Sequence, residues 1–201
     1  MTPFRTAAVW LASRPRVYRL IQSLAGQARV ASRLKRSLPV LPADAVLLDL
    51  GSAEGSFASH LGLDPVFTDI DLRPLLALRT RRTRCRAVAA DAAALPFRDA
   101  EFDASLCVAV AHHLDDGSLA RVAGELARVT RGYLVFLDPV RNERRTASRW
   151  LWRYDRGRYP RTRRELEAVL GRRFALEKRD EFSILHQYVS WIARPLRQRP
   201  G

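Results

Sequence analysis

The residues best suited to chemistry lie in one short turn. The segment from Leu47 to Leu61, LLDLGSAEGSFASHL, joins an apolar run to a helical pattern through Gly51 and Gly55. Glycine permits a positive φ and a close approach of a ligand to the backbone, and the free N–H groups at a helix start attract anionic groups. The turn therefore predicts a nucleotide-like ligand.

Carboxylates follow the neighbouring apolar runs. The second run ends VFTDID, which places Asp69 18 residues after Gly51 with Asp71 close by, and the third run ends in Asp91. A carboxylate at the adjacent strand end accepts hydrogen bonds from ribose hydroxyls, and either Asp69 or Asp71 suits that role. The dehydrogenase fingerprint GxGxxG is absent, because Ala53 replaces its middle glycine. A nicotinamide-dependent enzyme is therefore only a distant alternative.

An alternation of strand and helix patterns positions these residues. Strand-like runs are found at 45–50, 66–70, 87–90, 104–111 and 133–140, and helical patterns at 55–63, 72–82 and 118–129. This alternation predicts an α/β fold whose sheet is mainly parallel, with helices on both faces. A capping box, TRRE at 162–165, opens a further helix, and two runs at 174–183 and 187–193 predict an antiparallel hairpin.

The length of 201 residues predicts a single domain over 1–201. We divide it into a helical lead-in (1–42), a ligand-binding core (43–140), a basic aromatic segment (141–164), and a C-terminal helix and hairpin (165–201).

The formal charge is +14, and all but two of the 35 basic residues are arginines. Such a balance fits a nucleic acid or an anionic membrane as partner, whereas a GC-rich coding bias explains it without any partner. Ten arginines lie between 141 and 164, beside Trp150 and Tyr154. The segment has four interpretations: a lid over the substrate, a membrane contact, a nucleic-acid contact, or a packed helix with a solvated basic face.

Other classes of protein are disfavoured. No apolar run approaches the roughly 18 residues of a membrane span, and Arg14 and Arg16 interrupt the N-terminal apolar patch, so we expect a cytoplasmic protein. Cys85 and Cys107 form no CxxC pair, which predicts neither a metal site nor a disulfide.

Five motifs occur in order along the chain: VLLDLGSAEG, VFTDID, AADAAALPFRDAEFD, CVAVAHHLDD and ELARVTRGYLVFLDP. Together they resemble the class I S-adenosylmethionine-dependent methyltransferases, especially those acting on small molecules and lipid-like acceptors. The resemblance covers roughly 37–140 and implies a Rossmann-like, doubly wound, seven-stranded sheet with S-adenosyl-L-methionine as cofactor.

The resemblance also implies roles for single residues. The methionine part of the cofactor would lie against the glycine turn, the ribose against the second strand end, and the adenine against the third, with two helical residues of the lead-in closing over it. The residues so assigned are Asp49, Gly51, Ser52, Ala53, Gly55, Asp69, Ile70, Asp71, Asp91, Ala92, Cys107, Tyr18 and Gln22.

Methyl transfer is an in-line displacement, so an enzyme mainly aligns the acceptor, and a base is required only when the acceptor arrives protonated. His113, His112 and Asp138 are the candidates for catalysis or substrate contact, with packing or capping as the structural alternative. The expected activity is methyl transfer to a small-molecule or lipid-like acceptor. An RNA methyltransferase, or a methyltransferase-like binding protein without turnover, is the alternative.

Overall fold

The computed structural model describes residues 26–141, 158–184 and 186–196. Residues 1–25 of the expected helical lead-in lie outside these ranges, as do residues 142–157 of the basic aromatic segment. Within these ranges no helix has the length and apolar character needed to cross a bilayer.

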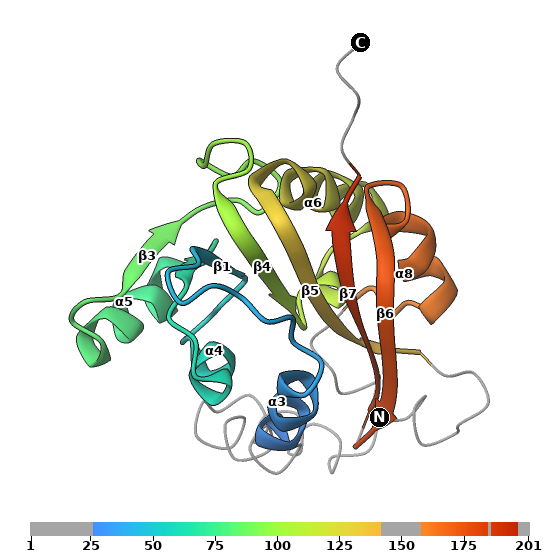
Figure 1. The fold of residues 1–201 in the computed structure, drawn as a ribbon, viewed down its shortest axis with the longest axis horizontal. Helices are drawn as coiled ribbons and strands as arrows, with labels where there is room; N and C mark the ends of the chain where they lie inside the picture. Colours follow the sequence, from blue (N-terminus) through green and yellow to red (C-terminus); the bar gives the residue numbers. More distant parts are fainter. Residues whose placement is uncertain (1–25, 142–157, 185, 197–201) are drawn as a thin grey trace, which may run out of the picture.

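Among the described residues, seven strands form one sheet in the order β3-β2-β1-β4-β5-β7-β6 (Figure 1). The strands are β1 (Leu47–Leu50), β2 (Val66–Asp69), β3 (Arg86–Ala89), β4 (Phe102–Val108), β5 (Thr130–Val140), β6 (Phe174–Ser183) and β7 (Gln187–Pro195). The first five are parallel, and β7 pairs antiparallel with both β5 and β6. The predicted mainly parallel sheet with a C-terminal hairpin is therefore confirmed.

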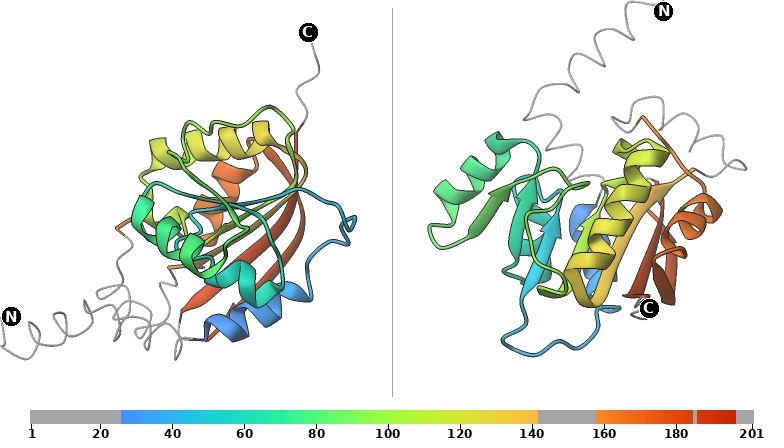
Figure 2. Two further views of the ribbon diagram at one scale, coloured as in Figure 1. Left: turned by 90° about the vertical axis from the view of Figure 1, so that its left-hand side faces the viewer. Right: turned by 90° about the horizontal axis from the view of Figure 1, so that it is seen from above.

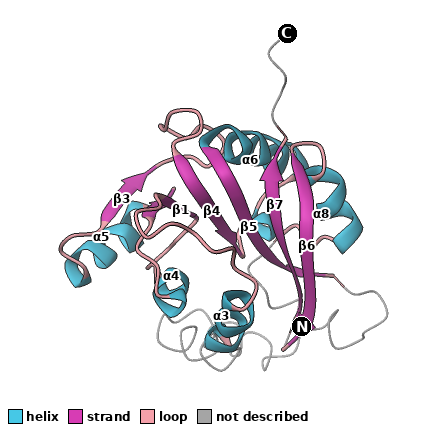
Figure 3. Cartoon of the chain, viewed as in Figure 1, coloured by secondary structure: helices cyan, strands magenta, loops and turns pink. Residues whose placement is uncertain are grey.

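The helices follow the predicted alternation with the strands (Figure 3). They are α3 (Gln27–Lys35), α4 (Ser56–Leu61), α5 (Leu72–Arg81), α6 (Asp116–Val129), α8 (Arg163–Leu170) and the short 3-10 helix η1 (Ala111–His113). The capping box is present, since the Thr162 side chain accepts from the Glu165 backbone and the Glu165 carboxylate accepts from the Thr162 N–H. Several predicted segments are longer than the observed ones, because helix and strand ends depend on contacts beyond the local pattern.

Two layers of helices cover the sheet, as the side view in Figure 2 shows. On one face α6 and α8 pack through residues such as Leu126 and Leu166, and Phe136 of β5 joins this cluster. On the other face α3 packs through Leu34 against Leu137 of β5. All four residues of β1 are buried, which explains why its sequence is a continuous apolar run broken only by Asp49.

The order of strands places the site. β1 and β4 are neighbours in the middle of the sheet, and the chain runs outward from them in opposite directions. In such sheets the crevice beyond the carboxyl ends of the strands binds ligands. The glycine turn follows β1 and the two histidines follow β4, so both sequence features meet at this crevice.

Candidate active site

The glycine turn after β1 is a strained piece of backbone. Gly51, Ala53 and Gly55 all have positive φ, at 66°, 47° and 68°. Internal hydrogen bonds hold the turn: Ser52 N–H donates to the Thr68 carbonyl at 2.8 Å, and Gly55 N–H donates to the Ser52 carbonyl at 2.8 Å. The turn is therefore tied to β2 before any ligand binds. Ala53 adopts a left-handed conformation that is unfavourable for a residue with a Cβ.

Gly51 also lies against the chain that follows β4. A Cβ at this position would stand 2.6 Å from Cγ2 of Val110, so glycine is required by close approach as well as by φ. Ala109, at φ 56°, turns the chain there and donates its N–H to the Leu137 carbonyl. The glycine turn is thus in direct contact with the chain from Ala109 to Leu114, here called the histidine segment.

The two carboxylates at the end of β2 differ in their contacts. Asp69 accepts hydrogen bonds on both oxygens, from the N–H of Ala53 and the N–H of Asp71, each at 2.9 Å. Asp71 caps α5 through the Arg73 N–H, and hydrogen bonds from the Arg73 guanidinium and backbone lower its pKa to about 2. Asp69 therefore holds the turn, whereas Asp71 is a half-buried, ionised carboxylate paired with the exposed Arg73 guanidinium.

The remaining predicted contacts lie along the same edge. Asp91 is exposed and its carboxylate accepts from the Ala93 N–H at 2.8 Å, while Ala92 packs on the core. Ile70, between the two carboxylates, is 77% exposed. Cys107 is buried beside the end of β1, and burial raises the pKa of its thiol.

Two buried oxygens at the glycine turn have no hydrogen-bond partner within the described chain: Oδ2 of Asp49 and Oγ of Ser52. Burial, reinforced by the charge of Asp69, raises the pKa of Asp49 from 3.8 to about 7. Buried polar atoms are normally paired. These two atoms are therefore where a ligand bearing hydrogen-bond donors or a positive charge would be stabilised.

The histidines after β4 have distinct surroundings. His112 is buried and its Nδ1 lies 2.8 Å from Oδ1 of Asp138, which ends the apolar part of β5. The other Asp138 oxygen accepts from the Ala111 N–H at 2.8 Å. His113 is exposed, with its ring centroid 4.1 Å from that of His112. A carboxylate acceptor at Nδ1 fixes the His112 tautomer and leaves Nε2 as the basic nitrogen.

Sequence reasoning missed Arg161, which holds this histidine segment. Its side chain is buried and donates to the carbonyls of Ala111 at 2.8 Å and Leu114 at 2.6 Å, and to the Asp116 carboxylate at 2.7 Å. Its own carbonyl accepts from the Arg141 N–H at 2.7 Å. Nothing in the sequence separated Arg161 from the other arginines around it, because its partners lie 45 to 50 positions away.

Some of the predicted site residues are not among those that the structure describes. Tyr18 and Gln22, together with the aromatic residues between 142 and 157, lie outside the described residues. Across the ranges that the structure covers, no group of three His, Cys, Asp or Glu side chains is arranged to hold a metal ion.

Comparisons with known proteins agree with this geometry. Residues 48–136, from β1 into β5, match the family model described as "Methyltransferase domain". The chain carries a methyltransferase domain. This family is the one that the five motifs resemble, and S-adenosylmethionine is its methyl donor.

Solved structures share the fold of this methyltransferase domain at low identity. An S-adenosylmethionine-dependent methyltransferase from Methanosarcina mazei has a TM-score of 0.67 and 19% identity, over 78% of this chain and 95% of that one. A geranyl diphosphate C-methyltransferase from Streptomyces coelicolor, in complex with S-adenosylhomocysteine, has a TM-score of 0.68 and 16% identity over 84% and 77%. A [4+2]-cyclase has a TM-score of 0.67 and 17% identity over 84% and 81%. No curated protein matches the sequence.

The described residues fit the cofactor of the methyltransferase domain. The buried oxygens of Asp49 and Ser52 lie beside a turn in which a Cβ at Gly51 would clash with Val110, and the exposed Ile70 and the half-buried Asp71 follow the end of the next strand, β2. In chemistry, these groups suit the ammonium, the flat base and the ribose hydroxyls of such a molecule.

Proposed function

We propose that this protein transfers a methyl group from S-adenosylmethionine to a small-molecule acceptor. The observation that carries the proposal is the unpaired oxygen pair of Asp49 and Ser52 at a turn that contacts the histidine segment. When bound, the cofactor supplies an electrophilic methyl group on sulfur. The acceptor would then approach from the side of His112, His113 and Asp138.

We assign the cofactor-holding residues as follows. Asp49 and Ser52 take the ammonium end, because a buried carboxylate with a raised pKa gains most from a cation beside it. The ribose hydroxyls are assigned to the carboxylates at the end of β2. Asp69 holds the Ala53 and Asp71 N–H groups, and Asp71 is paired with the exposed Arg73 side chain, which can move aside more readily than the backbone groups bound to Asp69. Ile70 offers an apolar surface for the base, with Asp91 further along the edge.

His112 is the candidate base in this proposal, with Asp138 as its positioning residue. The pair is buried, which excludes water from the proton that would be removed, and Asp138 orients the ring through Nδ1. His113, being exposed, is assigned to contact with the acceptor. Asp138 has both oxygens engaged and is not assigned a direct substrate contact.

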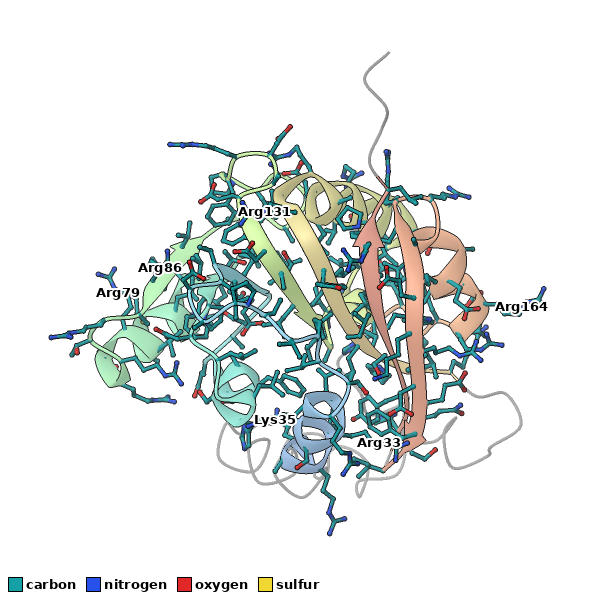
Figure 4. The ribbon with its side chains drawn as sticks, viewed as in Figure 1. Arg33, Lys35, Arg79, Arg86, Arg131 and Arg164 are labelled. Carbon is teal, nitrogen blue, oxygen red and sulfur yellow. The ribbon has the colours of Figure 1, made fainter. Side chains whose placement is uncertain are left out.

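Geranyl diphosphate in the Streptomyces coelicolor neighbour is a small molecule, which supports a small acceptor here. The nucleic-acid alternative has less support. In Figure 4 the labelled Arg33, Arg79, Arg131 and Arg164 lie in widely separated parts of the view. Arg33, moreover, is paired with Asp180 at 2.7 Å.

The test is calorimetric titration with S-adenosylmethionine and S-adenosylhomocysteine, with NAD as a control ligand. Asp71→Asn should weaken binding roughly 10-fold or more, because hydrogen bonds to a charged group are worth about 1.5–3 kcal/mol. Asp64→Asn is the matched control, since this exposed carboxylate lies before β2, at the opposite end of the strand. NAD should not bind. Failure of both sulfur ligands to bind the folded protein would sink the proposal. Saturable binding without conversion of S-adenosylmethionine to S-adenosylhomocysteine in the presence of any acceptor tested would favour a binding protein.

A further inference from the structure

A polar cavity of about 300 Å³ opens directly beside the histidine segment. Its lining residues are His113, Leu114, Asp115, Ser118, Arg158 and Tyr159. His113 immediately follows the buried His112, and Tyr159 donates its N–H to the His112 carbonyl at 3.0 Å. The cavity therefore adjoins the proposed base through two of its own lining residues.

Arg158 is the distinctive group in this lining. Within the described chain its guanidinium forms no ion pair with a carboxylate and donates no hydrogen bond to a carbonyl. Arg161, three positions along, is saturated by contrast, with its donors directed to Ala111, Leu114 and Asp116. A guanidinium presents planar donors that match a carboxylate or a phosphate. Arg158 thus brings an unused cation to the wall of the cavity.

The other charged groups around the cavity do not cancel this cation. Asp115 caps α6, and its carboxylate accepts from the Ser118 N–H at 2.7 Å and the Ser118 hydroxyl at 3.0 Å. Arg121 donates to the same hydroxyl at 3.0 Å and offsets the Asp115 charge. Asp116 is engaged with Arg161. The remaining polar groups facing the cavity are Arg158 and His113.

Leu114 and the aromatic Tyr159 are the less polar members of the lining. The Tyr159 ring is held at its base by the backbone bond to His112, yet the residue is 41% exposed, and Leu114 lies beside it. Exposed aromatic surface next to a cation suits a molecule with a carbon skeleton and a negatively charged end. A cavity of this size holds a fragment of such a molecule, and its remainder would extend toward His112.

We propose that this cavity binds the anionic group, a carboxylate or a phosphate, of the methyl acceptor through Arg158. The inference rests on the proposed function, because it takes the space beside His112 and His113 to be the acceptor side. It narrows the substrate class to acidic small molecules and makes Arg158 and Tyr159 determinants of specificity. It does not require Arg158 to take part in methyl transfer itself.

The experiment measures equilibrium binding of hexanoate and hexyl phosphate, with hexanol as the neutral control. Ligand-observed NMR on the full chain, with and without saturating S-adenosylhomocysteine, gives the affinities. We expect one or both anions to bind and hexanol to bind at least several-fold more weakly. The two anions distinguish a carboxylate from a phosphate acceptor.

Three variants make the test specific. Arg158→Gln should weaken anion binding roughly 10-fold or more, in line with loss of a charge-assisted contact. Arg164→Gln, which removes an exposed arginine of α8 away from the cavity, should leave it unchanged. Asp115→Asn should strengthen it several-fold, because asparagine keeps the helix cap while the negative charge is lost.

Equal anion affinities for wild type and Arg158→Gln would overturn the proposal. An equal loss of anion affinity in Arg158→Gln and Arg164→Gln would also overturn it, because it would indicate unspecific electrostatic attraction. Absence of binding by any probe would overturn it too. Binding of S-adenosylhomocysteine is measured on the same samples, so loss of the anion site with the cofactor retained is distinguished from failure of the proposed function.

Discussion

The two sides of the crevice are built on different principles. On the side of β1 and β2, backbone geometry dominates: positive φ angles, a glycine in contact with Val110, and buried oxygens of Asp49 and Ser52 without partners in the described chain. On the side of β4 and β5, side chains are saturated, with His112 bound to Asp138 and Arg161 bound to three residues.

This difference indicates which side of the crevice gains more free energy when a ligand binds. Leaving a buried carboxylate oxygen unpaired costs stability in the ligand-free protein, and a ligand that pairs with it recovers that cost as affinity. On the histidine side the buried groups His112, Asp138 and Arg161 are already held by hydrogen bonds before the acceptor arrives. An acceptor side held in this way suits a reaction whose main requirement is alignment.

The largest expected effect tests the strain on the cofactor side. The folded-state pKa of Asp49, about 7, lies above its unfolded value of 3.8, so the stability of the ligand-free protein should fall as pH rises from about 4 through about 7. Asp49→Asn should remove this loss and make the protein more stable at pH 8, by up to about 4 kcal/mol. Urea unfolding at pH 5 and pH 8 measures the difference.

The exposed Asp44→Asn variant is the control for Asp49→Asn and should keep the wild-type pH dependence. The Asp49→Asn variant should also bind the cofactor more weakly at pH 8, because it lacks the carboxylate that we assign to the ammonium. Parallel pH profiles for wild type and Asp49→Asn would show that Asp49 is not strained.

The second prediction tests the hydrogen bonds that Arg161 donates on the acceptor side. Arg161→Ala leaves the Ala111 and Leu114 carbonyls without this donor, and we expect a loss of about 2–4 kcal/mol in the free energy of unfolding. Hydrogen exchange should speed up around η1, while cofactor affinity changes little. Arg164→Ala, which truncates an exposed arginine on α8, should stay within about 0.5 kcal/mol of wild type. If Arg161→Ala lowered the free energy of unfolding as little as Arg164→Ala, the assigned role of Arg161 would be contradicted.

The third prediction concerns the contact that joins the two sides. Gly51→Ala places a Cβ 2.6 Å from Val110 and occupies a left-handed conformation, so we expect a loss of about 1–3 kcal/mol and weakened cofactor binding. Adding Val110→Ala should restore part of the stability, since only the steric contribution is relieved. Denaturant unfolding of the single and double variants measures this coupling.

Gly124→Ala provides the comparison for Gly51→Ala. Gly124 lies inside α6, where an added methyl group would meet no heavy atom within 4 Å, so alanine should stabilise the helix by about 0.5–1 kcal/mol. A Gly51→Ala variant that behaves like Gly124→Ala would show that the turn tolerates a side chain.

Local patterns in the sequence were sufficient for the cofactor side. The order of strands and helices, the turn at Gly51 and the carboxylates at the strand ends are encoded within short segments, where periodicity and glycine positions report backbone conformation directly. The methyltransferase resemblance rests on the same segments. The sequence pattern left open whether Asp69 or Asp71 suits the ribose. The hydrogen bond that the Ala53 N–H donates to Asp69 bears on this choice, and it depends on β1 and β2 lying side by side.

The acceptor side was decided by tertiary structure. His112 and Asp138 are 26 positions apart, and they pair because β4 and β5 are neighbours that end at the same edge. The sequence does not distinguish Arg161 from the other arginines. It is buried because the chain before α8 lies against η1 in the folded protein. Sequence alone determined the alternation of strands and helices and the turn after β1, because both are encoded in local patterns of residues. Which histidine is buried, which arginine is held, and which arginine has no partner among the described residues followed only from contacts between distant segments.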